Sequence, residues 1–209
     1  LPDPSELGLK KFLDFRDNFQ GDAKIIPGIP DIELVDDTLK NDPFCFFCGP
    51  LILDDLPNSI LPEIQRFFKL NRGKKKIYLT YGSVPTVPAE MTQCVKYILE
   101  KGIAVITTIN DELPEEEKPE FKKLIEKYPE QLLGVDYLPM HYVCSRVDLV
   151  IHHSGSAAYH YPIINHKPAV TVGTMCFDRD DTAVRLQELG LSDHIPSPEE
   201  NPEFVAQFK

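Results

Sequence analysis

The stretch that decides the fold is Val147-Asp148-Leu149-Val150-Ile151-His152-His153-Ser154-Gly155-Ser156, in which an apolar run ends in a loop of small residues. The apolar run predicts a buried β-strand, and residues 157–165 predict a helix directly after the loop. Such a helix leaves its first backbone N–H groups without intrahelical partners, at the positive end of the helix dipole. An anion-binding turn is therefore expected from His153 to Ala157.

A second strand end of the same design lies earlier in the chain. Residues 77–81 (Ile-Tyr-Leu-Thr-Tyr) predict a buried strand, and Gly82 and Ser83 follow it. Further strands are expected at residues 104–109, 131–135 and 169–172, and helices at 89–101, 115–128, 157–165 and 180–189. This alternation predicts an α/β protein with a Rossmann-like, doubly wound parallel sheet. With the usual strand order 3-2-1-4-5, the two small-residue turns face one crevice at the switch point.

The composition excludes several classes of protein. Hydrophobic residues make up 42% of the chain and charged residues 26%, which is typical of a globular protein, and no apolar run approaches the length of a membrane span. The net charge of −11 argues against nucleic acid as the main partner. The basic run at residues 72–76 is interpreted as a solvated strand entrance. Five scattered cysteines, an odd number, favour a reducing compartment, and a cytoplasmic location is predicted.

No metal or cofactor is expected. Cys45-Phe46-Phe47-Cys48 has the C-x-x-C spacing, but its phenylalanines predict a buried strand, and no second C-x-x-C completes a tetrahedral site. The acidic group of Asp178, Asp180 and Asp181 is interpreted as the start of a helix, where carboxylates are favourable, in preference to a magnesium site.

The first fifty residues differ from the rest of the chain. They contain a helix-like run at residues 5–18, a short strand at 23–27 and a passage rich in proline and aspartate at 27–43. Residues 1–50 are therefore interpreted as the remnant of a preceding domain and a linker. Since the chain starts without Met and ends in a helix-like run at residues 203–209, it is expected to be an excised piece.

Five motifs resemble, in order and spacing, the C-terminal half of nucleotide-sugar-dependent glycosyltransferases with the two-domain GT-B fold. They are Tyr78-Leu79-Thr80-Tyr81-Gly82-Ser83, Leu138-Pro139-Met140, His152-His153-Ser154-Gly155, Asp178-Arg179 and Arg185-Leu186-Gln187-Glu188-Leu189-Gly190-Leu191. The group that resembles the chain most contains the UDP-glucosyl- and UDP-glucuronosyltransferases and bacterial antibiotic and sterol glycosyltransferases. The resemblance covers roughly residues 40 to 209, and it implies that residues 51–209 form a nucleotide-sugar donor-binding domain.

The resemblance also implies roles for single residues. Gly82 and Ser83 match the turn against the donor diphosphate, where glycine allows the backbone to approach closely. Leu138 and Met140 match positions whose main chain recognises the base. His153 matches a histidine that donates a hydrogen bond to a phosphate oxygen. Next to it, the anion site at the start of the helix is completed by Ser154, Gly155 and the amides of Ser156 and Ala157.

The sugar end of the site departs from the family pattern. Asp178 matches an acidic residue that accepts hydrogen bonds from sugar hydroxyls. Arg179 stands where most relatives have glutamine, and a guanidinium pairs with carboxylate or phosphate. Tyr161 stands where plant members have a glutamate for the ribose. Ala157-Ala158 replaces residues that would offer side-chain hydrogen bonds to the phosphate, so only backbone amides remain there.

If the resemblance holds, the activity is transfer of a sugar from a UDP or dTDP sugar to an acceptor hydroxyl, with inversion. The family's catalytic base lies in an N-terminal domain, so no catalytic residue is assigned, and the chain is expected to be inactive alone. The acceptor-binding part is expected as an N-terminal domain or a separate chain. Two alternatives stay open, namely a nucleotide-sugar epimerase of the same fold and a non-catalytic donor-binding subunit of a two-chain glycosyltransferase.

Overall fold

The computed structural model describes residues 23–33, 41–52, 61–82, 87–109 and 112–209, and the helix expected at residues 5–18 and Ser83 lie outside these ranges. The chain divides into two compact units, Leu1–Leu51 and Ile52–Lys209, which are described separately. No described helix combines the length and the apolar character that crossing a bilayer requires.

The first unit contains a pair of short parallel strands, β1 (Lys24–Ile26) and β2 (Cys45–Phe47). Both strands were expected, but the prediction that the second is buried is wrong. Phe44 is 61% exposed and Phe46 54% exposed. A sheet two strands wide cannot shield both of its faces, so the aromatic pattern here does not mark a core.

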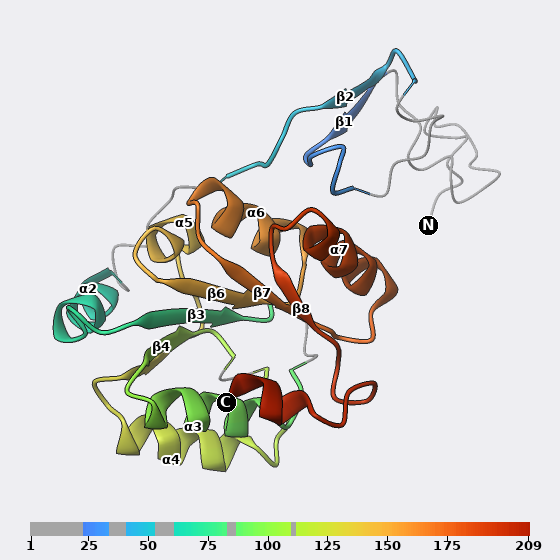
Figure 1. Cartoon of the computed structure of the whole chain (residues 1–209). Helices are drawn as coiled ribbons and strands as arrows, with labels where there is room; N and C mark the ends of the chain where they lie inside the picture. Colours follow the sequence, from blue (N-terminus) through green and yellow to red (C-terminus); the bar gives the residue numbers. More distant parts are fainter. Residues whose placement is uncertain (1–22, 34–40, 53–60, 83–86, 110–111) are drawn as a thin grey trace, which may run out of the picture. The chain divides into compact units, whose positions relative to one another are not determined.

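The second unit is built on a six-stranded, entirely parallel sheet (Figure 1). Its strands lie in the order β5 (Leu132–Gly134), β4 (Ala104–Thr107), β3 (Lys76–Thr80), β6 (Leu149–His152), β7 (Ala169–Val172) and β8 (Asp193–Ile195). The doubly wound sheet and the pairing of the first strand with the fourth are confirmed. The sixth strand was not predicted, because Asp193-His194-Ile195 is too short and polar to give a strand signal.

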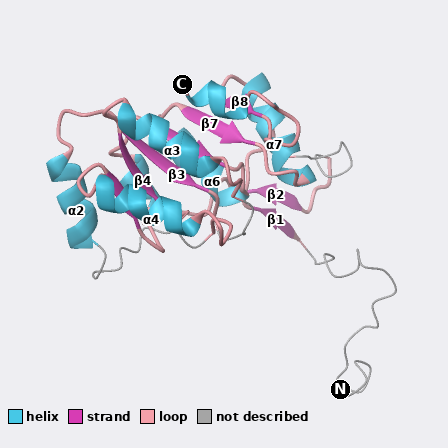
Figure 2. Ribbon diagram, turned by 90° about the horizontal axis from the view of Figure 1, so that it is seen from below, coloured by secondary structure: helices cyan, strands magenta, loops and turns pink. Residues whose placement is uncertain are grey.

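Helices cover both faces of the sheet. Figure 1 shows α3 (Met91–Glu100), α4 (Lys118–Lys127) and η3 (Phe204–Phe208) on one side and α5 (Met140–Cys144) and α6 (Ser156–Ile164) on the other, and Figure 2 shows α3 and α4 lying side by side. Successive side chains of β3 therefore enter different cores. Ile77 and Leu79 pack in the cluster under α3 and α4, whereas Tyr78 packs in the opposite cluster. Burial on both faces explains the continuous apolar runs of the strands.

Three segments differ from the sequence-based expectation. The passage before β3, for which no helix was predicted, contains the helix α2 (Leu61–Leu70), whose Ile64 and Phe67 are buried in the second cluster. The helix expected at residues 180–189 begins earlier, as α7 (Phe177–Glu188). The helix-like end of the chain forms the short 3₁₀ helix η3, which packs on α3.

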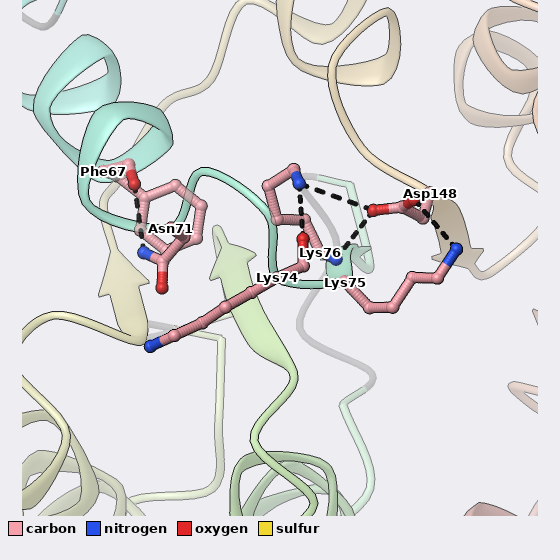
Figure 3. A network of polar contacts seen from close by, with 6 residues as sticks. All are labelled: Phe67, Asn71, Lys74, Lys75, Lys76 and Asp148. Carbon is pink, nitrogen blue, oxygen red and sulfur yellow. Dashed lines mark hydrogen bonds and ion pairs between the residues drawn. The ribbon is translucent and has the colours of Figure 1, made fainter.

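A polar network ties the amino ends of β3 and β6 together (Figure 3). The backbone N–H of Lys76 donates to Oδ2 of Asp148 over 2.9 Å, and Nζ of Lys75 lies 3.3 Å from Oδ1. Nζ of Lys76 lies 3.6 Å from Oδ2, and the backbone N–H of Asp148 donates to the Lys76 carbonyl. Part of the basic run at residues 72–76 thus joins two strands, at the edge opposite the small-residue turns.

Replacing Asp148 with alanine is expected to lower the free energy of unfolding by about 1 kcal/mol, because the Lys76 N–H loses its acceptor. Burial opposes the charge, but the Lys76 N–H and the two lysines outweigh it, so the pKa of Asp148 lies below its ordinary value. The stabilisation is therefore complete at neutral pH and is lost as pH falls through that pKa. Urea unfolding at pH 7 and pH 3 measures this, with Asp193→Ala, at the start of β8, as control. Equal midpoints for the two variants at pH 7 would contradict the assignment.

Candidate functional site

The two small-residue turns lie next to each other at the carboxyl ends of β3 and β6. Thr80 of β3 is paired with His152 of β6, so the chain leaves the sheet at neighbouring points on the way to Gly82 and His153. Gly82 adopts a φ of 72°, a conformation that side chains rarely allow. The sequence-predicted crevice at the switch point thus has both of its turns in place, apart from Ser83, which lies outside the described residues.

The ring of His153 occupies a slot between these turns. A Cβ atom added to Gly82 would lie 2.7 Å from Cε1 of the ring, and one added to Gly155 would overlap Nε2. The buried ring of Tyr81 is stacked with it, with 6.1 Å between centroids and 16° between planes. His153 is only 5% exposed. Gly82, His153 and Gly155, which belong to the two turns predicted to face one crevice, therefore form one packed unit.

Two buried polar atoms in this unit have no hydrogen-bond partner among the described residues, namely Nδ1 of His153 and Oγ of Ser154. Ser154 has a φ of 60°, and its backbone N–H donates to Nδ1 of His152 over 3.1 Å. The first intrahelical bonds of α6 go from Ala158 and Tyr159 to the Gly155 carbonyl. The amides of Ser156 and Ala157 precede them and remain available to a ligand. The two free amides and the Ser154 hydroxyl form a group of donors that fits an anion.

Both histidines at this turn are neutral at physiological pH. Burial lowers the pKa of His153 to about 4, helped by the charge of Arg179 and opposed by the Thr80 carbonyl and the charge of Asp178. Burial likewise lowers the pKa of His152 to about 3. An anion here is therefore met by N–H dipoles and not by an imidazolium charge. Because the charges of Asp178 and Arg179 act on His153, those two residues lie near its turn.

A cavity of about 340 Å³ lies beside the turn, at the carboxyl ends of β3, β4 and β5. It contains four of the residues that the sequence singled out, Gly82, Leu138, Met140 and Tyr161. Six further lining residues were not assigned to the site from the sequence: Tyr78 and Thr80, which lie in the first motif, and Thr108, Glu112, Asp136 and Tyr137, which lie in none. Thr80 ends β3 and Thr108 directly follows β4, so their position at the carboxyl ends of the strands was the signal that the sequence offered for these two.

Local structure explains how the cavity wall is held. Oγ1 of Thr80 accepts a hydrogen bond from the Gly82 N–H over 3.2 Å and lies 3.1 Å from Oγ1 of Thr108. Leu138, which also lines the cavity, is buried in the second hydrophobic cluster. Met140 opens the short helix α5 directly after Pro139. The wall thus combines hydroxyl groups with main-chain donors and acceptors, which suits a polar heterocycle or a ribose.

Asp178 and Arg179 lie in the first turn of α7, outside this cavity. Asp178 is exposed, and its Oδ1 accepts a hydrogen bond from Sγ of Cys176 over 3.0 Å, the main reason that its pKa is lowered. The other two aspartates of the acidic group have protein partners, the Thr174 N–H for Asp180 and Arg185 for Asp181. Within the described part of the chain, no three His, Cys, Asp or Glu side chains are placed to hold a metal ion.

Comparison with known proteins gives one curated relative by sequence, and no family model matches the chain. Aklavinone 7-beta-L-rhodosaminyltransferase of Streptomyces galilaeus is 29% identical over 80 residues, which are 38% of this chain and 18% of that protein.

Solved glycosyltransferases share the fold. UGT71G1 of Medicago truncatula, complexed with UDP-glucose, matches with a TM-score of 0.65 and 15% identity over 92% of this chain and 45% of that one. The calicheamicin glycosyltransferase CalG4 matches with a TM-score of 0.60 and 16% identity over 90% of this chain and 44% of that one. The glycosyltransferase SnogD of Streptomyces nogalater matches with a TM-score of 0.58 and 15% identity over 88% of this chain and 48% of that one. The second unit therefore has the Rossmann-like architecture of one half of a GT-B glycosyltransferase, and the chain spans less than half the length of these structures.

Proposed function

We propose that residues 51–209 bind the donor of an inverting glycosyltransferase, a UDP or dTDP sugar. The observation that carries this proposal is the His153 slot between two glycine turns, beside a polar cavity at the switch point of a GT-B-like sheet. Ligands of doubly wound sheets bind at this point. The UDP-glucose in the complex of UGT71G1 supports a uridine donor.

Each part of the donor has a counterpart in this site. The cavity takes the base and ribose, with the main chain of Leu138 and Met140 at the base and Tyr161 at the ribose. His153 and the start of α6, from Ser154 to Ala157, take the diphosphate. Asp178 and Arg179 face the sugar. During transfer the neutral His153 N–H and the helix dipole stabilise the departing diphosphate, while burial keeps water from weakening these contacts.

The acceptor hydroxyl and the base that deprotonates it come, in this proposal, from an N-terminal domain or a separate chain. The name of the relative from Streptomyces galilaeus, an aklavinone rhodosaminyltransferase, supports a sugar other than glucose. The chain alone is therefore a binding unit without transferase activity. Its five cysteines, all free thiols, support a cytoplasmic location.

Isothermal titration of the chain with UDP, dTDP, UDP-glucose and GDP tests the proposal. We expect saturable binding of UDP or dTDP at one site, and weaker binding of GDP because the larger purine overfills the cavity. Asp148→Ala, at the opposite edge of the sheet, is the control and should bind like the native chain. Absence of heat with all four ligands, on protein whose circular dichroism shows the folded state, would overturn the proposal.

A further inference from the structure

The loop between β7 and α7 is held by two side-chain hydrogen bonds. At its start, the backbone N–H of Thr174 donates to Oδ1 of Asp180 over 2.9 Å. At its end, Sγ of Cys176 donates to Oδ1 of Asp178 over 3.0 Å. Met175 between them has a φ of 56°, which is uncommon for a residue other than glycine. The loop is thus fixed in one unusual conformation immediately before the proposed sugar-binding carboxylate.

Cys176 takes the position at which a helix normally has a capping side chain. It is the N-cap residue of α7, with extended backbone angles, and its carbonyl accepts from the N–H groups of Arg179 and Asp180. Serine, threonine, aspartate or asparagine usually stands here and accepts a hydrogen bond from the helix backbone. The thiol makes no such cap and donates to a side chain. The hydrogen bond of the thiol therefore fixes the Asp178 side chain and does not cap the helix.

We propose that Cys176 is a positioning residue, whose thiol orients the Asp178 carboxylate toward the hydroxyl groups of the donor sugar. The inference rests on the proposed function. With Oδ1 held by the thiol, the exposed carboxylate presents Oδ2 in a defined direction. A hydroxyl donor then binds a preorganised acceptor, and less side-chain freedom is lost on binding.

Binding of UDP and UDP-glucose to Cys176→Ala and Cys176→Ser tests the role. Alanine removes the donor and should weaken UDP-glucose binding about fivefold, the size of one ordinary hydrogen bond, while leaving UDP binding unchanged. Serine keeps an O–H donor and should restore most of the affinity. A loss shared equally by UDP and UDP-glucose would mean that the thiol acts only on the structure of the loop and would overturn the proposal. So would unchanged UDP-glucose affinity in Cys176→Ala.

A second measurement needs no ligand. The hydrogen bond and the charge of Asp178 raise the pKa of the Cys176 thiol, which keeps it protonated and slow to react. Asp178→Asn should therefore speed alkylation of Cys176 by iodoacetamide, measured peptide by peptide, while the exposed thiol of Cys48 in the same sample reacts at its former rate. An unchanged rate at Cys176 refutes the contact even if nucleotide sugars bind. Faster alkylation without any nucleotide binding refutes the proposed function instead.

Discussion

Gly82→Ala should abolish measurable binding of UDP and destabilise the fold by about 3 kcal/mol, the sum of strain at a positive φ and overpacking. The backbone at Gly82 has a φ of 72°, and the added Cβ would lie 2.7 Å from Cε1 of His153. The ring has little room to move away, because Tyr81 is stacked with it and no space for a Cβ atom remains between its Nε2 and Gly155. Titration calorimetry and urea unfolding measure the two effects.

Gly102→Ala is the matched control. Gly102 has nearly the same backbone conformation, with a φ of 77°, but no atom lies within 4 Å of the position of its Cβ. This variant should cost only the backbone strain, about 1 kcal/mol, and bind UDP like the native chain. If Gly82→Ala and Gly102→Ala lose the same stability and both bind UDP, the His153 slot does not exist in solution.

His153→Ala is expected to weaken UDP-glucose binding by about 1–3 kcal/mol, roughly ten- to hundredfold, the usual effect of losing a hydrogen bond to a charged group. Nδ1 of His153 is buried, whereas Nε2 lies against Gly155 at the start of α6. His153→Gln, whose amide nitrogen reaches the place of Nε2, should keep part of the affinity. His153→Asn, whose amide corresponds to Nδ1, should bind as weakly as the alanine variant. Equal affinities of all three variants and the native chain would leave His153 a purely structural role.

The pH dependence gives an independent check of the same residue. Because the pKa of His153 lies at about 4, the ring is neutral from pH 8 to pH 6. UDP-glucose carries a diphosphate without a group that titrates in this range, so its affinity should stay constant across the ordinary histidine pKa of 6.5. Affinity should rise only as pH approaches 4 and the ring gains a proton. A tenfold gain in affinity between pH 7.5 and pH 6 would show that His153 binds as a cation.

The sequence predicted those elements whose signal is local. Strands β3, β4, β6 and β7 are buried on both faces, so each is a continuous apolar run that can be recognised without its neighbours. β8 pairs only with β7 and contains Asp193 and His194, so no such run marks it. The phenylalanines around Cys45 led to a false prediction of burial, because a strand pattern does not indicate whether a second layer will cover the strand.

The residues of the candidate site likewise fall into those with a local sequence signal and those without one. Gly82 and Gly155 were predicted because a glycine soon after a strand allows a tight turn and a close approach of the backbone to a ligand. That property can be recognised without knowledge of distant residues. That one histidine ring would contact both was not predictable, since it depends on the pairing of β3 with β6. Thr108 and Tyr137 belong to no motif, and only the folded sheet brings them to one cavity with Thr80. The thiol of Cys176 was missed because its partner depends on where α7 begins.

The parallel pairing of β3 with β6 also has a kinetic consequence. Lys76 starts β3 and Asp148 directly precedes β6; they are 72 positions apart in the chain, and β4, β5 and their helices lie between them. Contacts of such separation form late, because the entropy of closing a long loop must be met first. The proposed binding crevice depends on this pairing, so nucleotide binding is expected only when folding is complete. A fluorescent nucleotide analogue added during refolding would therefore report the last step of folding and not the formation of helices or single strands.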